Sequence, residues 1–313
     1  MSGKIADPLN TKIEFLEEHS AVQMWRELVG KNSIPCSINK LKINKRKEVY
    51  RLNGVGPSGY SVIGKRALRS TLSIERIVYE KILPQIPSAY LKYYGFIEEK
   101  ESDFCWLFIE EAPGVPYSEL NGLHRALASN WLAIMNVTTA HLPPPNLLPI
   151  VSYHRHLSCL NMASDIIIKY FTHPVLTKKD TAILENIIGY FTVIKNHWDE
   201  VSGFCDSLPL CLIHGDFYGK NIHVNEKDCN PELYVMDWEA AGWGIPAEDF
   251  GELDVGVYWS VVKNLDFPLT LQNVQWLSNF GLMFKYINLI QGTTIGFEKD
   301  WIEGAIGHLA VYD

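Results

Sequence analysis

The stretch from Leu212 to Val224 reads LIHGDFYGKNIHV, and it decides how the rest of the chain is interpreted. Its polar core, H-G-D-x-x-x-x-N, places Asp216 and Asn221 five residues apart, directly before an alternating segment that begins at Ile222. A tight loop of this length lets the two side chains converge on one side, and alternation of apolar and polar residues is typical of a half-buried strand. The stretch therefore predicts a polar loop that leads into a β-strand.

A second acidic residue follows an apolar strand. The run LYVMDWE delivers Asp237 to the end of that strand, and the hairpin between Ile222 and Met236 brings it beside the loop. Phosphoryl transfer needs such a set: one carboxylate orients or deprotonates the attacking hydroxyl, while another carboxylate and a neutral oxygen hold Mg²⁺ against the nucleotide phosphates. Protein kinases meet this need with H-R-D-x-x-x-x-N and D-F-G.

At these residues the chain resembles the aminoglycoside phosphotransferase and choline kinase superfamily, whose catalytic loop is usually H-G-D or H-N-D. The resemblance implies that Asp216 is the catalytic base. It implies that Asn221 and Asp237 are the Mg²⁺ ligands, and that ATP or GTP is the phosphate donor.

The same resemblance gives three neighbouring residues supporting roles. His214 would be a structural anchor for the loop and neither an acid nor a base. Asp249, in the run GWGIPAEDF from Gly242 to Phe250, would buttress the loop. Glu239 is a candidate for an additional metal ligand or for a residue that contacts the ligands without binding the metal.

The first third of the chain supplies the candidates for a nucleotide clamp. A strand lysine paired with a helix glutamate is expected to reach the phosphates, and Lys65 and Glu75 fit these two positions. Arg66 is the rival of Lys65, although neighbours on a strand point in opposite directions. Glu110 and Ala112 stand where the family links its lobes, so their backbone groups would bind the nucleotide base.

Two features here depart from known phosphate loops. GYSVIGK, from Gly59 to Lys65, matches the start of a P-loop, but Arg66 follows where the metal needs a Ser or Thr hydroxyl, so we reject that interpretation. The turn between the first two strands, residues 44–48, reads NKRKE and contains no glycine. Positive side chains could replace backbone contacts to phosphate there; alternatively, nucleotide binding could be weaker.

The pattern along the chain predicts an α+β protein with a small β-rich front and a larger helical back, and the resemblance implies a protein-kinase-like fold with two lobes. Residues 1–112 would form a small β-rich nucleotide-binding lobe with one helix and an N-terminal helical extension, and residues 113–313 a larger, mainly helical catalytic and substrate-binding lobe. Strands are expected at 37–43, 49–52, 60–67, 93–97 and 104–110. Helices are expected at 12–29, 72–83, 119–141, 183–198, 247–263 and 269–291, and at the C-terminus.

Charge is distributed unevenly in this chain of 313 residues with a formal net charge of −8. Residues 31–69 hold ten Lys or Arg against one acid, whereas residues 237–313 hold eleven Asp or Glu against three Lys. A basic front half suits phosphates and an acidic back half suits a cationic acceptor, although two solvated faces would give the same pattern. The acidic candidates for the acceptor are Glu252, Asp254, Glu298, Asp300 and Glu303.

We therefore expect a kinase that uses Mg²⁺ and ATP or GTP to phosphorylate a hydroxyl of an aminoglycoside-like, aminoalcohol or natural-product acceptor. The alternative is a catalytically silent, nucleotide-binding regulator on the same scaffold. The first residues, MSGKIADPLN, lack a basic stretch followed by an apolar run, so we expect no secretory signal and a cytoplasmic protein. We expect neither nucleic acid nor membrane as a partner.

Overall fold

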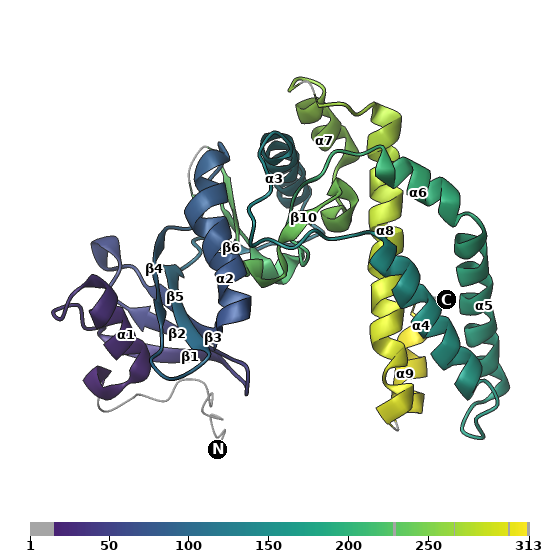
Figure 1. Cartoon of the computed structure of the whole chain (residues 1–313), viewed down its shortest axis with the longest axis horizontal. Helices are drawn as coiled ribbons and strands as arrows, with labels where there is room; N and C mark the ends of the chain where they lie inside the picture. Colours follow the sequence, from purple (N-terminus) through teal and green to yellow (C-terminus); the bar gives the residue numbers. More distant parts are fainter. Residues whose placement is uncertain (1–15, 228–229, 266, 300, 312–313) are drawn as a thin grey trace, which may run out of the picture.

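The computed structural model describes residues 16–227, 230–265, 267–299 and 301–311. A β-rich N-terminal lobe precedes a larger, mainly helical part, which confirms the predicted α+β architecture (Figure 1). No helix in the described part of the chain is both long enough and apolar enough to span a bilayer.

The N-terminal lobe is built on one antiparallel sheet of five strands in the order β1-β2-β3-β5-β4. All five strands were predicted, with starts that differ by up to two residues. Their bounds are Ser37–Ile43 (β1), Lys47–Asn53 (β2), Val62–Leu68 (β3), Tyr93–Glu98 (β4) and Phe104–Glu110 (β5).

Two helices cover the two faces of this sheet. On one face, α1 (Ser20–Val29) packs Trp25 against Phe108, with 5.4 Å between ring centroids. On the other face, α2 (Arg69–Ile77) packs its apolar residues against β3 and β5. The predicted N-terminal helix is thus shorter than expected, and its residues 12–15 lie outside the described part of the chain.

The helix after β3 departs from the prediction at its end. Instead of one α-helix up to residue 83, α2 continues as a π-helix, Val78–Ile82, and then as a 3-10 turn, Leu83–Gln85. Pro84 has no backbone N–H to donate, so a regular helix cannot run through it. Glu75 lies within α2 itself, on the side that packs against the sheet.

The helical part contains two small sheets, β7-β10 and β6-β8-β9, and the polar loops described above connect their strands. Their bounds are Val115–Pro116 (β6), Cys211–Ile213 (β7), Ile222–Asn225 (β8), Glu232–Val235 (β9) and Gly242–Gly244 (β10). The chain leaves the N-terminal sheet at Glu110 and joins β8 at Val115, so it passes between the lobes in this interval. The division at residues 112 and 113 stays a prediction.

Helices surround these sheets and extend away from them. Capping boxes begin α5, with Thr177 and Asp180, and α8, with Thr270 and Asn273. The helices are Gly122–Ala140 (α3), His154–Tyr170 (α4), Lys178–Asn196 (α5), Trp198–Asp206 (α6), Val255–Val262 (α7), Leu271–Thr294 (α8) and Ile302–Leu309 (α9).

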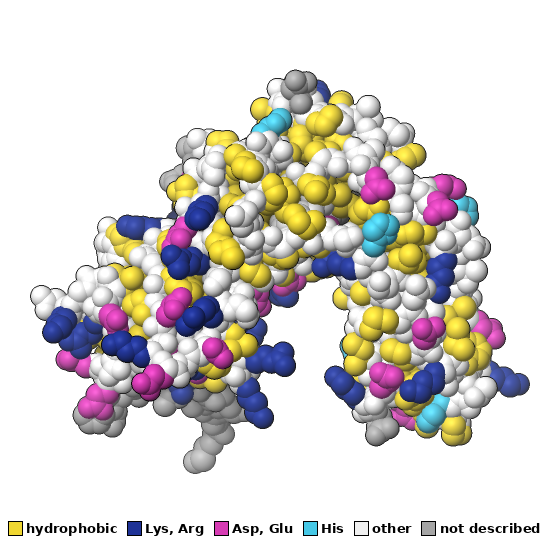
Figure 2. All heavy atoms as spheres, viewed as in Figure 1, with side chains coloured by type: hydrophobic (Ala, Val, Ile, Leu, Met, Phe, Trp, Pro, Cys, Tyr) yellow, Lys and Arg dark blue, Asp and Glu magenta, His cyan; other side chains and the backbone are white. Residues whose placement is uncertain are grey.

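Two separate hydrophobic cores hold the helical part together. One lies around α3, α7 and the small sheets and continues under α2, while the other joins α4, α5, α8 and α9. The helices α4, α5, α8 and α9 lie on the opposite side of the molecule from the N-terminal lobe (Figure 1). The surface is therefore hollowed between the two sides, as Figure 2 shows.

Candidate active site

The 214–221 loop begins where β7 ends, and a buried carboxylate holds its first residues. Asp249, from the 3-10 turn Pro246–Asp249, accepts hydrogen bonds from the backbone N–H of His214 at 2.5 Å and of Gly215 at 2.8 Å. Burial raises the pKa of the Asp249 carboxyl to about 7, although these two hydrogen bonds oppose the rise. The predicted buttress is therefore in contact with the loop.

His214 links the loop to the strand that ends at Asp237. Its Nε2 lies 3.0 Å from the backbone oxygen of Met236 and donates to it, while its Nδ1 accepts from the backbone N–H of Asp216 at 3.2 Å. Burial lowers the pKa of His214 to about 4, so the ring is neutral at pH 7. These contacts match the predicted anchor, because a neutral imidazole satisfies one donor and one acceptor.

Two residues of the site have left-handed backbone conformations. Gly215 has φ 75°, and a Cβ atom there would collide with the carbonyl oxygen of Ala240. Asp237 has φ 68° and ψ 57°, a conformation that Asp tolerates better than most residues. Such conformations gather at sites where geometry is constrained.

Asp216 and Asn221 converge as their spacing predicts. The side-chain amide of Asn221 donates to the backbone oxygen of Asp216 at 2.9 Å and to its Oδ2 at 3.0 Å. Lys220 places its Nζ 2.7 Å from the same Oδ2. Because the Asn221 nitrogen is used in this way, its amide oxygen is the atom that can face a cation.

Asp237 is held opposite this pair by lysines of the N-terminal sheet. The Nζ of Lys65 lies 2.6 Å from Glu75 Oε1 and 3.1 Å from Asp237 Oδ1, so the strand lysine and the helix glutamate form an ion pair. Burial alone would raise the pKa of the Asp237 carboxyl. The ammonium groups of Lys65 and Lys47 outweigh this effect and hold that pKa well below its usual range. Burial disfavours the charge on Lys65, but Glu75 and Asp237 raise its pKa above the ordinary value.

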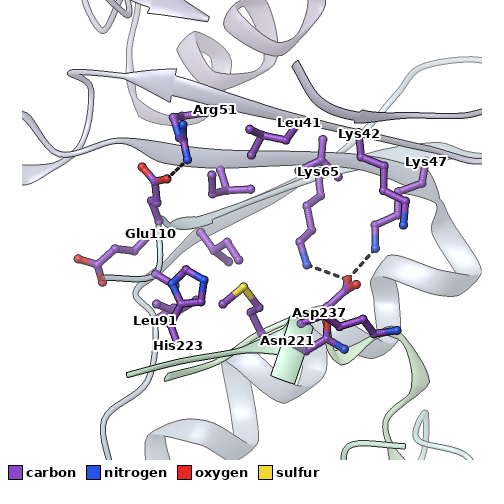
Figure 3. Close-up of a pocket in the computed structure, with 17 residues that line it drawn as sticks. Leu41, Lys42, Lys47, Arg51, Lys65, Leu91, Glu110, Asn221, His223 and Asp237 are labelled. Carbon is purple, nitrogen blue, oxygen red and sulfur yellow. Dashed lines mark hydrogen bonds and ion pairs between the residues drawn. The ribbon is translucent and has the colours of Figure 1, made fainter. Parts of the chain in front are cut away.

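Lys47 is a site residue that sequence reasoning did not single out. It lies at the start of β2, and its Nζ is 2.6 Å from Asp237 Oδ1 and 2.8 Å from Glu239 Oε2. Figure 3 shows Lys47 and Lys65 approaching Asp237 from the strands of the sheet. The glycine-free turn contained the only signal for this residue, as one of its three basic side chains.

One end of a cavity of about 310 Å³ between the lobes is lined by Lys47, Lys65, Asn221 and Asp237 (Figure 3). Its other end is mostly apolar and contains the predicted Glu110 and Ala112. The lining residues are Leu41, Lys42, Lys47, Val49, Arg51, Ile63, Lys65, Leu91, Ile109, Glu110, Glu111, Ala112, Lys220, Asn221, His223, Met236 and Asp237. The cavity therefore joins an apolar pocket to a cluster of charges.

Several polar groups border the apolar end. The backbone N–H of Glu110 donates to the oxygen of Lys92 at 2.8 Å, and Arg51 forms an ion pair with Glu111. His223, on β8, has a buried Nδ1 with no hydrogen-bond partner among the described residues. A buried nitrogen without a hydrogen-bond partner suits a ligand that offers a hydrogen-bonding group to it.

Several other sequence candidates lie away from the cavity. Arg66 points to the opposite face of β3 and pairs with Glu99 and Glu48, as strand alternation predicts. The rejected P-loop stretch proves to be mostly strand, because Gly64 and Lys65 lie within β3 and no helix begins there.

Most of the predicted acceptor acids are not gathered at one place. Glu252 lines a small hollow beside the 214–221 loop, but Asp254 caps α7 and Glu303 lies on α9. Glu298 pairs with Lys169 near the far end of α4, about 21 Å along that helix from its loop-facing first turn. Asp300 lies outside the described residues.

The donor set for a metal is small. No group of three or more His, Cys, Asp or Glu side chains in the described ranges is arranged as a metal site. Asp237 and the amide oxygen of Asn221 both line the cavity, with Glu239 beside them. One or two carboxylates supplemented by substrate phosphates are a usual environment for Mg²⁺, so these residues fit that ion.

Comparison with solved structures shows the same fold in known phosphotransferases. The GDP complex of wild-type aminoglycoside 2'-phosphotransferase-IIIa is 12% identical, with a TM-score of 0.65 over 93% of this chain and 98% of that one. Plasmodium vivax ethanolamine kinase is 15% identical, with a TM-score of 0.55 over 92% of this chain and 84% of that one.

Sequence comparison adds a family and a local relative. Mouse acyl-CoA dehydrogenase family member 11 is 41% identical over 49 residues, which are 16% of this chain and only 6% of that protein. Residues 76–266, well over half of the chain, match the phosphotransferase enzyme family known as APH. This match shows that the chain belongs to the phosphotransferase enzyme family.

Proposed function

We propose that this protein transfers the γ-phosphate of ATP or GTP to a hydroxyl group of a small molecule. The observation that carries the proposal is that Lys65, Asn221 and Asp237 line one end of the interlobe cavity, where Asn221 contacts the carboxylate of Asp216. Phosphoryl transfer requires mainly positioning and charge stabilisation, and these four residues offer a carboxylate, an amide oxygen, a second carboxylate and an ammonium group.

Asp216 is assigned the part of the base. Its carboxylate is partly exposed and contacts the side chains of Asn221 and Lys220. It would accept or orient the proton of the attacking hydroxyl. His214 and Asp249 would keep the loop in position and take no part in proton transfer.

Asn221 and Asp237 are assigned to the metal, and Lys65 to the donor phosphates. Mg²⁺ at this place would offset the charge of the phosphates and of the transferring group. Glu75 keeps Lys65 in place from within α2. At the apolar end, Ile63, Ile109 and Met236 would pack against the base, with the backbone near Ala112 as its polar partner.

For the acceptor, the proposal names a class of compounds. Kanamycin occupies one structural neighbour and ethanolamine is the substrate named for another, which supports a hydroxyl-bearing amine as the first compounds to test. Glu252 lies near enough to the loop to contact such a cation. A cytoplasmic location and the absence of nucleic acid and membrane partners belong to the same proposal.

An acceptor screen with γ-labelled ATP and GTP tests this function. Aminoglycosides, aminoalcohols and uncharged hydroxyl compounds are incubated with the wild type and with Asp216→Asn. We expect labelled product from at least one acceptor, and a loss of about 10³-fold in Asp216→Asn, because general-base catalysis contributes about 10²–10⁴-fold.

Glu298→Gln is the matched control, since it removes a carboxylate far from the loop. It should keep the wild-type rate. Undiminished transfer by Asp216→Asn would defeat the assignment of the base. Thermal stabilisation by Mg-ATP without transfer or hydrolysis would instead favour a nucleotide-binding regulator.

A further inference from the structure

The turn between β1 and β2 is ordered without glycine. Asn44 accepts hydrogen bonds through its Oδ1 from the backbone N–H groups of Arg46 and Lys47, both at 2.9 Å, and its own N–H donates to the oxygen of Lys47 at 2.9 Å. An asparagine side chain that bonds to the following backbone is a standard way to close a turn. These backbone N–H groups are thus used within the turn.

The closed turn fixes where the lysine of β2 points. Val49 is paired with Lys65 across the two strands, and Lys47 precedes Val49 by two residues, so it shares the same face of the sheet. All three side chains line the interlobe cavity. Lys45, at the tip of the turn, is exposed instead.

Lys47 is buried deeply for a lysine and is paired with acids of the other lobe. Only 8% of its surface is exposed, and its Nζ contacts both Asp237 and Glu239. Asp237 Oδ1 thus receives two ammonium groups, one from Lys47 and one from Lys65. Lys65 has Glu75 as a second, fully buried partner, whereas the second partner of Lys47 is the partly exposed Glu239.

We propose that Lys47 is a second phosphate-binding lysine for the donor nucleotide and replaces the glycine-rich turn that this chain lacks. The inference rests on the proposed function. When Asp237 binds a divalent cation, its carboxylate can no longer neutralise both ammonium groups. Of the two lysines, Lys47 lacks a second, fully buried carboxylate partner. Its charge is then directed to the phosphate end of the cavity, where a desolvated ammonium binds phosphate oxygens strongly.

Binding of ADP and of adenosine to the same variants tests this role, because adenosine lacks the phosphates. Dissociation constants are measured by titration calorimetry, in EDTA and again with Mg²⁺; GDP and guanosine replace the pair if the guanine nucleotide binds more tightly. Lys47→Met should weaken ADP binding about tenfold or more, the usual effect of losing a charged hydrogen bond. Adenosine binding should change less than about twofold.

Two further variants separate phosphate binding from a structural role. Lys45→Met removes the same charge from the exposed tip of the turn and should leave both affinities unchanged. Lys47→Arg keeps the charge and should retain most of the preference for ADP. If Lys47→Met does not fold, Lys47→Gln supplies the same comparison.

Equal weakening of ADP and adenosine, or no change in either, would overturn the phosphate role of Lys47 and leave it a structural ion pair. Failure of the wild type to bind either nucleotide is a different result, since it would overturn the proposed kinase function together with this inference.

Discussion

The two sides of the cleft are constructed in different ways. The floor, formed by the 214–221 loop and Asp237, is held by hydrogen bonds with backbone groups. Asp249 accepts from two N–H groups of the loop, and His214 donates to the backbone oxygen of Met236. The roof, formed by Lys47 and Lys65, is held by ion pairs between side chains. Fixed backbone geometry suits the floor, where atoms must be placed for chemistry, and adjustable ammonium groups suit the roof, where phosphates enter.

Asp237 is the point at which floor and roof meet, so changing it has the largest expected effect. Asp237→Asn removes the carboxylate that both roof lysines share and one of the two proposed metal ligands. We expect kcat/KM for phosphate transfer to fall about 10³-fold, the scale of losing a central electrostatic group. The rate is measured at saturating Mg²⁺ with the best acceptor from the screen.

The same variant should bind ADP in EDTA at least as tightly as the wild type, because two ammonium groups lose their competing carboxylate. Transfer within about tenfold of the wild-type rate would show that Asp237 is not a metal ligand of the reaction. Weaker ADP binding in EDTA would show that the roof depends on Asp237 for its shape.

The floor was predictable from the sequence and the roof only in part. Motif spacing brought Asp216, Asn221 and Asp237 together because Asp216 contacts Asn221 and because Asp237 closely follows β9, which pairs with β8. Lys65 was expected from its place on the third strand, and strand alternation separated it from Arg66. The contacts of Lys47 depend on the register of β2 and on how the lobes meet, and a run of three basic residues in a turn does not reveal which of them faces inward.

The acceptor side illustrates the same limit. An excess of acids over residues 237–313 describes composition, whereas only Glu252 among the four proposed acids that the structure describes lies beside the loop. Asp254 serves as a helix cap and Glu298 as half of a surface ion pair. Net charge of a segment therefore did not locate a binding surface, because helices distribute their charged residues over several faces.

Protonation of His214 should loosen the floor at acidic pH. Burial lowers the pKa of His214 from 6.5 to about 4, so the unfolded chain takes up a proton that the folded protein resists. Its contribution to the free energy of unfolding is complete above about pH 6.5 and is lost as pH falls toward 4, by up to about 3 kcal/mol. Urea unfolding between pH 4.5 and 7.5 measures this loss.

His214→Asn isolates the contribution. The difference in free energy of unfolding between wild type and variant should be largest at pH 7 and should shrink as the pH falls. Burial raises the pKa of Asp249, which acts in the opposite direction, but both proteins keep that carboxyl, so its effect cancels in the difference. A difference that does not vary with pH would mean that His214 is not held neutral in the folded protein.

The smallest expected effect concerns Arg66, the neighbour of Lys65 on β3. Its guanidinium pairs with Glu99 and Glu48 and lies 4.2 Å from the centre of the Phe104 ring, on the face of the sheet away from the cleft. Arg66→Met should cost about 1 kcal/mol of stability, since partly exposed pairs contribute little. It should leave the dissociation constant for ADP unchanged, whereas Lys65→Met should raise it. The two substitutions each remove one positive charge, at adjacent positions in the sequence. An equal loss of ADP affinity in both variants would therefore mean that the roof binds phosphate through its overall charge, whichever face of the sheet each basic side chain occupies.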